Sequence, residues 1–261
     1  MARDSEPFSD YTNPAREALQ QKRSEIEREC RALRHFRRDI QTLEATTPQG
    51  KQPRCLTVQS ISSPSTPVFS TIGDCYRETV MGVGHYEAVY GDSLRDSMAA
   101  EFGISVVTRL SEADHLTPAL KNLVLNRAGL CIERRQTFLE VLEDEDASLA
   151  DAYATVSDIE DTLTAVELSP EATVSFSKLG TQYERLDSIE ATCESWLQKR
   201  QQELHERWSD TSMRDRTERD LCPYLYESVA VDYPVLATFV EIADAARRRQ
   251  SRVIRNIQHT P

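Results

Sequence analysis

Apolar residues recur every three or four positions along most of the chain, which is the spacing of one face of an α-helix. The pattern starts after the Asn-Pro pair at residues 13–14, where an N-cap residue precedes a proline suited to the first helical position. Four apolar residues then follow at intervals of seven: Leu19, Ile26, Leu33 and Ile40. That interval predicts a coiled-coil seam, although the matching positions Lys22 and Glu29 are charged. We expect a disordered N-terminus over residues 1–13 and a helix over residues 14–46.

The helical period is lost between residues 47 and 71, where Pro, Ser, Thr and Gln dominate. This composition is typical of a linker, and we interpret residues 47–71 as one. The period returns afterwards and continues nearly to the end of the chain. We therefore expect a helical bundle domain over residues 72–257.

A stretch near the start of this domain, CYRETVMGVGHYEAVYGDSL, first suggests a binding site, because tyrosines, glycines and a histidine crowd together. Its residues Tyr76, Val83 and Tyr90 are seven apart, however, which places them on one face of a helix. We interpret the tyrosines as core packing in a helix that ends near Phe102, with a glycine cap behind it. The glycines mark a kink or a close helix crossing. His85 lies off the stripe, where it can be exposed, and has no evident acid–base partner.

Two longer helices and a shorter one complete the predicted fold. The first starts at Pro118 after a threonine cap and runs to Leu168, with Arg135 and Glu145 interrupting its apolar seam. The second covers residues 173–208, and the short connection between the two favours an antiparallel hairpin. Pro234 either kinks the last helix or splits it. We predict an all-α fold, an elongated antiparallel bundle of long, coiled-coil-like helices.

Charge is abundant and uneven. The 261-residue chain has a net charge of −12, and only 5 of its 31 basic residues are lysine. An excess of acid with little lysine suits proteins of salt-loving archaea, because high salt screens acidic self-repulsion; an acidic protein from a GC-rich genome is the alternative. The chain has neither an apolar run long enough to span a membrane nor an N-terminal secretory signal, so we expect a cytoplasmic protein.

Eleven acids and no Lys or Arg lie between Glu140 and Glu171. The C-terminal helix instead carries a basic cluster, our candidate interaction residues: Arg247, Arg248, Arg249, Arg252 and Arg255. These arginines can face the acidic run within the chain. Alternatively, they and the basic segment 31–38 can contact nucleic acid, although no DNA-binding motif is present.

Four segments resemble, in this order along the chain, an uncharacterised family of helical proteins from halophilic archaea: ALQQKRSEIERECRALRHF, YRETVMGVGHYEAVYGDSLRDSMAAEFG, IERRQTFLEVLEDEDASL and YLYESVAVDYPVLATF. The resemblance covers about residues 15–255. It implies an all-helical architecture and a domain of unknown function, and it implies no catalytic residues.

Sequence motifs for catalysis are absent, and we predict no catalytic, cofactor-binding or metal-binding residues. The six cysteines are scattered, so zinc or redox pairs are not expected. Glu112 and His115 have the spacing of a di-iron ligand pair, but no second copy accompanies them. We therefore expect a non-enzymatic helical scaffold or protein-interaction protein with a protein partner or self-association. No small-molecule substrate is evident, and the alternative is a nucleic-acid-associated or transcription-linked regulator.

Overall fold

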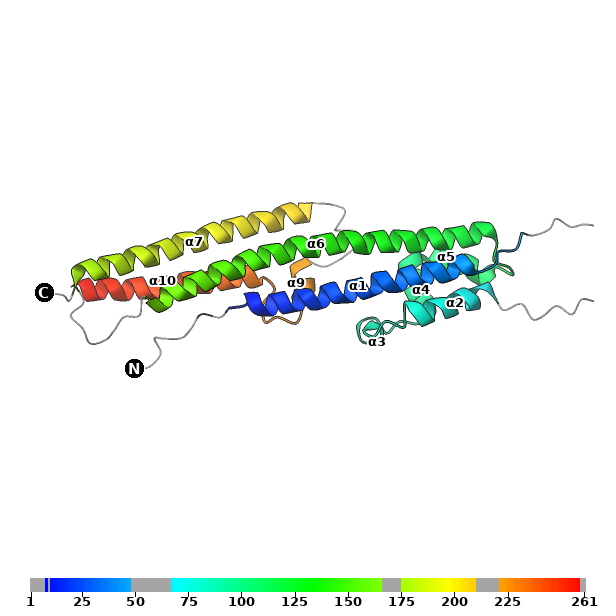
Figure 1. Cartoon of the computed structure of the whole chain (residues 1–261), viewed down its shortest axis with the longest axis horizontal. Coiled ribbons are helices and arrows are strands. Elements are labelled where there is room, and N and C mark those ends of the chain that lie inside the picture. The colour runs from blue at the N-terminus through cyan, green and yellow to red at the C-terminus, as the bar shows by residue number, and fades with distance from the viewer. Residues whose placement is uncertain (1–7, 9, 48–66, 166–174, 210–220, 259–261) are drawn as a thin grey trace, which may run out of the picture. The chain divides into compact units, whose positions relative to one another are not determined.

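The computed structural model describes residue 8 and residues 10–47, 67–165, 175–209 and 221–258. Every regular element in these ranges is a helix, and they contain no β-strand (Figure 1). The all-α prediction is therefore confirmed for the described residues. Most of the expected disordered N-terminus and most of the expected linker lie outside these ranges, so those parts stay predictions. Both were drawn too long, because residues 12–13 belong to the first helix and residues 68–71 to the second.

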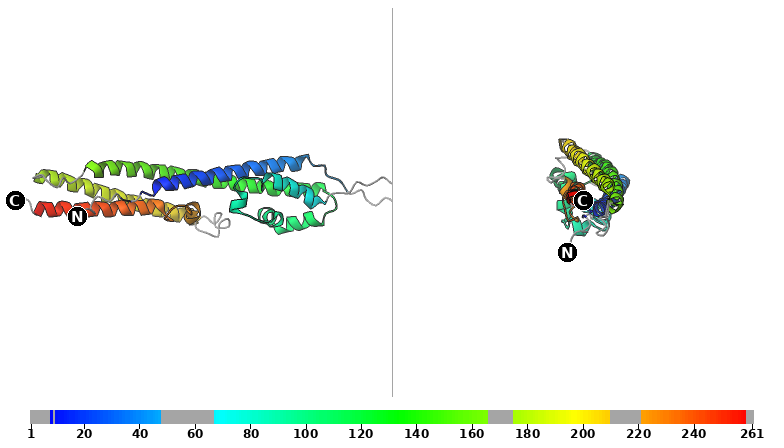
Figure 2. Two further views of the ribbon diagram at one scale, coloured as in Figure 1. Left: turned by 90° about the horizontal axis from the view of Figure 1, so that it is seen from below. Right: turned by 90° about the vertical axis from the view of Figure 1, so that its left-hand side faces the viewer.

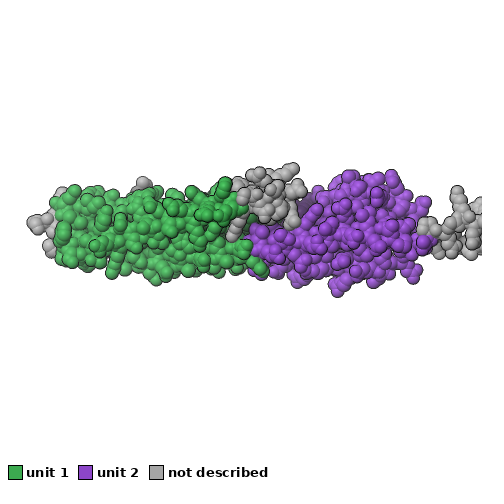
Figure 3. Space-filling model, turned by 90° about the horizontal axis from the view of Figure 1, so that it is seen from above, with its two compact units in different colours: residues 1–22, 143–261 green, residues 23–142 purple. Residues whose placement is uncertain are grey.

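The chain divides into two compact units (Figure 3). Unit 1 comprises residues 1–22 and 143–261, and unit 2 comprises residues 23–142. Two long helices, α1 (Thr12–Thr42) and α6 (Pro118–Ala165), contribute residues to both units. The composition of the sequence suggested a domain boundary at the linker, residues 47–71. The boundaries between the two compact units instead fall within α1 and α6, because the units are defined by which helix segments pack together.

Helix α1 agrees with the predicted N-terminal helix except at its ends. It starts at Thr12, where Asp10 Oδ1 accepts a hydrogen bond from the backbone N–H at 2.8 Å, and it ends at Thr42 rather than near residue 46. The four apolar residues of the predicted seam are all buried: Leu19, Ile26, Leu33 and Ile40. The interval of seven therefore identified the packed face of this helix.

Besides its parts of α1 and α6, unit 2 contains four short helices: α2 (Val68–Thr79), α3 (Tyr86–Val89), α4 (Leu94–Phe102) and α5 (Ile104–Glu112). Their core centres on three aromatic rings, those of Phe36, Tyr76 and Phe102, with ring centroids 5.5–5.6 Å apart. Edge-to-face and stacked ring pairs at such distances add to the stabilisation from burial alone. The core thus joins α1, α2 and α4.

The continuous helix expected from Tyr76 to Phe102 is wrong. The chain forms α2, the single turn α3 and α4, with irregular turns between them. Gly91 has φ +59°, and a Cβ at Gly82 would come within 2.6 Å of the Glu78 carbonyl oxygen, so both turns favour glycine. Tyr76 is buried, but Tyr90 is 43% exposed, because the interval of seven has no meaning across a broken helix.

Gly103 ends α4 with φ +93° and ψ 143°, as the predicted glycine cap required. This backbone conformation strains any residue that has a Cβ. We expect Gly103→Ala to lower the free energy of unfolding by about 1–3 kcal/mol in urea titrations of the full chain. The control is Gly129→Ala within α6, where no atom lies within 4 Å of the new Cβ and helix propensity favours alanine by about 1 kcal/mol. Equal effects of the two substitutions would contradict this assignment of strain.

Unit 1 contains the start of α1, the second half of α6, α7 (Phe176–Ser209), α9 (Leu221–Leu225) and α10 (Pro234–Gln258). Helices α7 and α10 lie side by side (Figures 1 and 2), and the rings of Trp196 and Phe239 stack between them at 5.0 Å. Pro234 is the first residue of α10, so it splits the last element rather than kinking it.

Helices α6 and α7 run in opposite directions along their contact. Ser148 donates a hydrogen bond to Glu203 at 3.1 Å, while residues 155–162 of α6 share a groove with residues 185–192 of α7. The predicted hairpin connection at 169–173 lies outside the described residues. Among the helices that the structure describes, none has a stretch long and apolar enough to cross a membrane.

Candidate functional site

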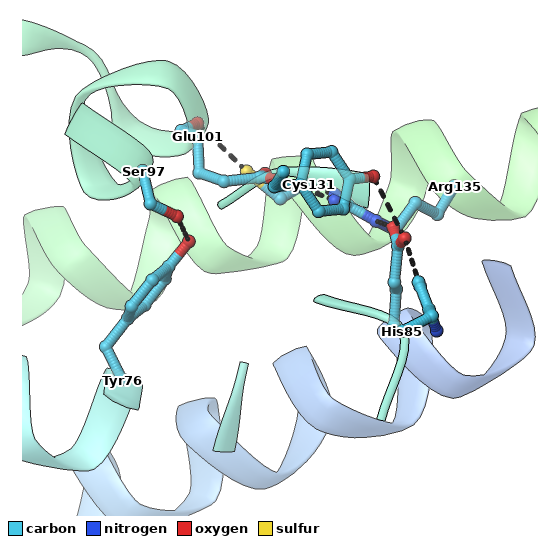
Figure 4. Close-up of polar contacts among 8 residues, drawn as sticks. Tyr76, His85, Ser97, Glu101, Cys131 and Arg135 are labelled. Carbon is cyan, nitrogen blue, oxygen red and sulfur yellow. Dashed lines mark hydrogen bonds and ion pairs between the residues drawn. The ribbon is translucent and has the colours of Figure 1, made fainter. Parts of the chain in front are cut away.

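Five polar side chains of unit 2 form one connected cluster, of which Figure 4 labels three. They come from four parts of the unit, namely α1, the turns between α2 and α4, α4 itself and α6: Glu29, His85, Tyr90, Glu101 and Arg135. We call this set the Glu29 cluster. Its five ionisable side chains make it a candidate site for chemistry.

Glu29 is at the centre of the cluster, and its side chain is only 8% exposed. Its Oε1 accepts hydrogen bonds from His85 Nε2 and from the Tyr90 hydroxyl, each at 3.0 Å. Its Oε2 accepts one from Arg135 Nε at 2.7 Å. The guanidinium of Arg135 then bonds both carboxylate oxygens of Glu101, one of them at 3.1 Å. The cluster therefore ties α1 to α6 and α6 to α4.

These contacts decide the charge states. Burial alone would raise the pKa of Glu29, but the charge of Arg135 and the hydrogen bonds from His85, Arg135 and Tyr90 together hold that pKa below its ordinary value. Burial would lower the pKa of Arg135, and the bonds and charges of Glu101 and Glu29 outweigh it and raise the pKa. Glu29 and Arg135 are consequently both charged at neutral pH.

A cavity of about 60 Å³ adjoins the cluster. Its walls include Val83, Tyr86, Ser97 and the members of the Glu29 cluster. In the described part of the chain, His85 Nδ1 has no hydrogen-bond partner, and the buried Tyr86 hydroxyl lies near Ser97 without a hydrogen bond of good geometry. Because a buried water needs about 10–15 Å³, the cavity has room for a few waters and is far smaller than a substrate pocket.

The nearby hydroxyl and thiol groups are not activated. Burial raises the pKa of the Cys131 thiol to about 12, and its Sγ donates to the backbone carbonyl of Glu101 at 3.1 Å. Burial likewise raises the pKa of Tyr76, whose hydroxyl bonds Ser97 Oγ at 3.0 Å (Figure 4). A protonated thiol and phenol are poor nucleophiles, so neither group equips the cavity for covalent catalysis.

Two tyrosines beside the cavity allow a matched test of this geometry. Tyr76→Phe removes the bond to Ser97, and we expect the free energy of unfolding to fall by about 1 kcal/mol. Tyr86→Phe removes a hydroxyl that lies near Ser97 but makes no hydrogen bond of good geometry, and we expect no change or a gain of up to about 1 kcal/mol. Urea denaturation measures both. A loss of more than about 1 kcal/mol for Tyr86→Phe would mean that its hydroxyl bonds an ordered water.

Unit 1 contains a second buried ionic cluster. Arg200, which is 3% exposed, bonds the carboxylate of Glu145, and the Tyr226 hydroxyl donates to the same carboxylate. Arg200 Nη1 also lies 3.2 Å from Glu203 and 3.3 Å from Ser148. This Glu145 cluster joins α6, α7 and the end of the α9 segment.

The C-terminal arginines do not behave alike. Arg247 pairs with Glu190 of α7 at 2.5 Å and approaches Asp244 at 3.5 Å, so its partner lies outside the acidic run at 140–171 that we expected. Arg248 and Arg255 are exposed, whereas Arg249 and Arg252 are half-buried. One arginine therefore holds α10 to α7, and the cluster is not a single free surface.

The basic segment of α1 is exposed instead. Four arginines and a histidine point away from the core: Arg31, Arg34, His35, Arg37 and Arg38. In the described part of the chain none of the four arginines forms an ion pair, while His35 lies 3.7 Å from Asp39. We call these arginines the α1 arginine face.

The remaining sequence candidates are separate from one another. Glu112 is the last residue of α5 and His115 follows in the connection to α6. The described residues contain no group of three or more His, Cys, Asp or Glu side chains that could hold a metal ion. The described cysteines are free thiols: Cys30, Cys75, Cys131, Cys193 and Cys222. The structure thus adds no ligand set to the sequence candidates.

Sequence reasoning missed both buried clusters, although a signal for them was present. Glu29, Arg135 and Glu145 each occupy a seam position of a helix, where an apolar residue is expected. A charge on a seam indicates a buried ion pair, because an unpaired charge there would be very costly. His85 was expected to lie where it can be exposed and to have no acid–base partner. Its side chain is in fact only 11% exposed and forms a hydrogen bond with Glu29.

A family model described as a domain of unknown function (DUF7260) matches residues 10–250. The chain belongs to this family. No curated protein and no solved structure shows significant similarity to it. The match covers both compact units, so both belong to the family's domain.

Proposed function

We propose that this chain is a non-enzymatic helical scaffold or protein-interaction protein. One observation carries the proposal: its buried charged groups bind one another across helices. Glu29, Glu101 and Arg135 join α1, α4 and α6, and Glu145 joins α6 to α7 through Arg200. In some proteins, buried polar or ionic groups of this kind specify which helices pack together. Catalytic groups, in contrast, need a substrate-sized space beside them.

We also propose the finer architecture and setting. The opposite directions of α6 and α7 support an elongated antiparallel bundle, and the buried seam of α1 supports coiled-coil-like packing. The net charge of −12 with 5 lysines supports a cytoplasmic protein of a halophilic archaeon.

The experiment tests whether the charges of the Glu29 cluster serve only the packing of the helices or take part in a reaction. Glu29→Gln, Glu101→Gln and Arg135→Met together remove the charges of the Glu29 cluster while roughly keeping its volume. The wild type and this variant would be crosslinked in the producing cell at its own salt concentration, and bound proteins identified by mass spectrometry. We expect protein crosslinks, self-crosslinks included, and the same partners for both proteins.

Two results would overturn the proposal. One is the absence of any protein crosslink when a known complex in the same cell is captured. The other is a growth defect caused by the variant while its helix content and melting temperature match the wild type, since that would indicate chemistry at the cluster.

A nucleic-acid-associated regulator is the second candidate, and the exposure of the α1 arginine face favours it. Phosphate contacts would make such binding strongly dependent on salt. Retention of the full chain on duplex and single-stranded DNA across a salt series measures it. Salt-insensitive or absent retention would exclude this candidate.

A further inference from the structure

Charge on the α1 arginine face is of the opposite sign to the protein as a whole. The chain has a net charge of −12, yet Arg31, Arg34 and Arg38 follow one another at steps of three and four along one exposed stripe of α1. Like charges so close together repel, and in the described part of the chain no carboxylate pairs with them. An acidic partner would therefore relieve a repulsion as well as form new ion pairs.

A stripe of matching spacing occurs on α6. Five exposed residues alternate aspartate with alanine at steps of three and four: Asp144, Ala147, Asp151, Ala154 and Asp158. The alanines leave room for another helix to approach closely between the carboxylates. Asp158 also borders the groove between α6 and α7, and the other four residues do not. We call this set the α6 acidic stripe.

The two stripes match in length. Arg31 and Arg38 are seven residues apart, as are Asp144 and Asp151, and each interval corresponds to about 10.5 Å along a helix. Two helices packed side by side can therefore bring both arginines to aspartates in the same register. Guanidinium groups bind carboxylates with two parallel hydrogen bonds, which gives geometric specificity as well as attraction.

We infer that the α1 arginine face of one copy docks on the α6 acidic stripe of a second copy. The inference rests on the proposed interaction function and names its partner as this same chain. Each copy carries both faces, so the contact either closes as a reciprocal dimer or adds further copies. Nucleic acid is the competing occupant of the arginine face, and the matched spacing of the carboxylates on the α6 acidic stripe favours a second copy.

Charge reversal tests the docking. Sedimentation equilibrium of the full chain would be run at the lowest salt at which its helix content is native. We expect the wild type to self-associate, and R31E/R34E/R38E and D144R/D151R/D158R each to weaken association about 10- to 100-fold. Mixing these two variants should restore association, since reversed arginines on one copy then meet reversed aspartates on the other. R77E/R95E/R109E changes three exposed arginines of the same unit by the same charge and should associate like the wild type.

Several outcomes would overturn the inference. The inference is wrong if the wild type stays monomeric up to millimolar concentration, or if R77E/R95E/R109E weakens association as much as the two test variants. It is also wrong if association survives both charge reversals, or if mixing the two test variants does not restore it. A monomeric wild type whose retention on DNA is lost in R31E/R34E/R38E identifies nucleic acid as the occupant. A monomer that still crosslinks to other proteins overturns the docking alone and leaves the proposed function standing.

Discussion

Arg200→Met is expected to lower the free energy of unfolding by about 3–5 kcal/mol. Arg200 and Glu145 have side chains that are only 3% and 2% exposed. Removing the guanidinium takes a positive charge away from the buried Glu145 carboxylate, and the hydroxyl of Tyr226, which bonds the same carboxylate, is neutral and does not replace that charge. Burying a charge without an opposite charge is among the most destabilising changes that a single substitution makes.

The measurement is urea denaturation of the full chain, with hydrogen exchange of α6 and α7 as a local readout. Lys199→Met is the matched control, because Lys199 is the preceding residue of α7, its side chain is 51% exposed and it lies 3.8 Å from Glu203. We expect this exposed pair to contribute less than about 1 kcal/mol. Arg200→Met combined with Glu145→Leu should recover most of the loss, since it removes the buried charge. A loss below about 1 kcal/mol for Arg200→Met alone would mean that water reaches Glu145.

The periodic seam predicted the packed face of α1 well, whereas Phe176 and Tyr183 of the seam predicted for α7 are exposed. Leu19, Ile26, Leu33 and Ile40 are all buried, and Gly103 ends a helix as expected. Such features depend on local spacing and backbone preference, which the sequence shows directly. The seam extended through Tyr90 failed because the count assumed an unbroken helix, while Gly82 and Gly91 allow turns that a helix cannot contain.

The buried clusters could not be predicted to the same extent. The charged seam positions Glu29, Arg135 and Glu145 were visible, but their partners were not. Glu29 and Arg135 are 106 residues apart, and Arg200 is 55 residues from Glu145. Which charges meet depends on how the helices pack, and no local pattern encodes that pairing. His85 shows the same limit, because its acid partner lies on another helix.

Arg135→Met is the second substitution with a large expected effect, and its signature is a change in the pH dependence of stability. In the wild type the pKa of Glu29 is lowered from 4.5, so its folded carboxylate binds protons less readily than the unfolded one. The resulting stabilisation is fully present above pH 4.5 and is lost as the pH falls through the lowered pKa. The facing charged and titratable groups are His85, Tyr90, Glu101 and Arg135.

Without Arg135, burial of Glu29 is opposed by the hydrogen bonds from His85 and Tyr90 alone among the causes named above, so its folded pKa should rise. The folded variant then binds protons more readily than the folded wild type, so the stabilisation that Glu29 contributes at neutral pH shrinks. We expect a loss of about 3–5 kcal/mol at pH 7 that shrinks as the pH is lowered toward 4.5. Melting temperatures of the wild type and the variant between pH 4 and pH 7, at constant salt, measure the difference.

A second substitution isolates the role of Glu29 in that difference. Arg135→Met with Glu29→Gln removes the carboxylate that Arg135 neutralises, and keeps a side chain of the same shape between His85 and Tyr90. We expect this double variant to be more stable than Arg135→Met at pH 7. We also expect that its loss of stability relative to the wild type does not become smaller as the pH is lowered. If Arg135→Met loses the same amount of stability relative to the wild type at pH 7 and at pH 4.5, another group keeps Glu29 charged in the absence of Arg135.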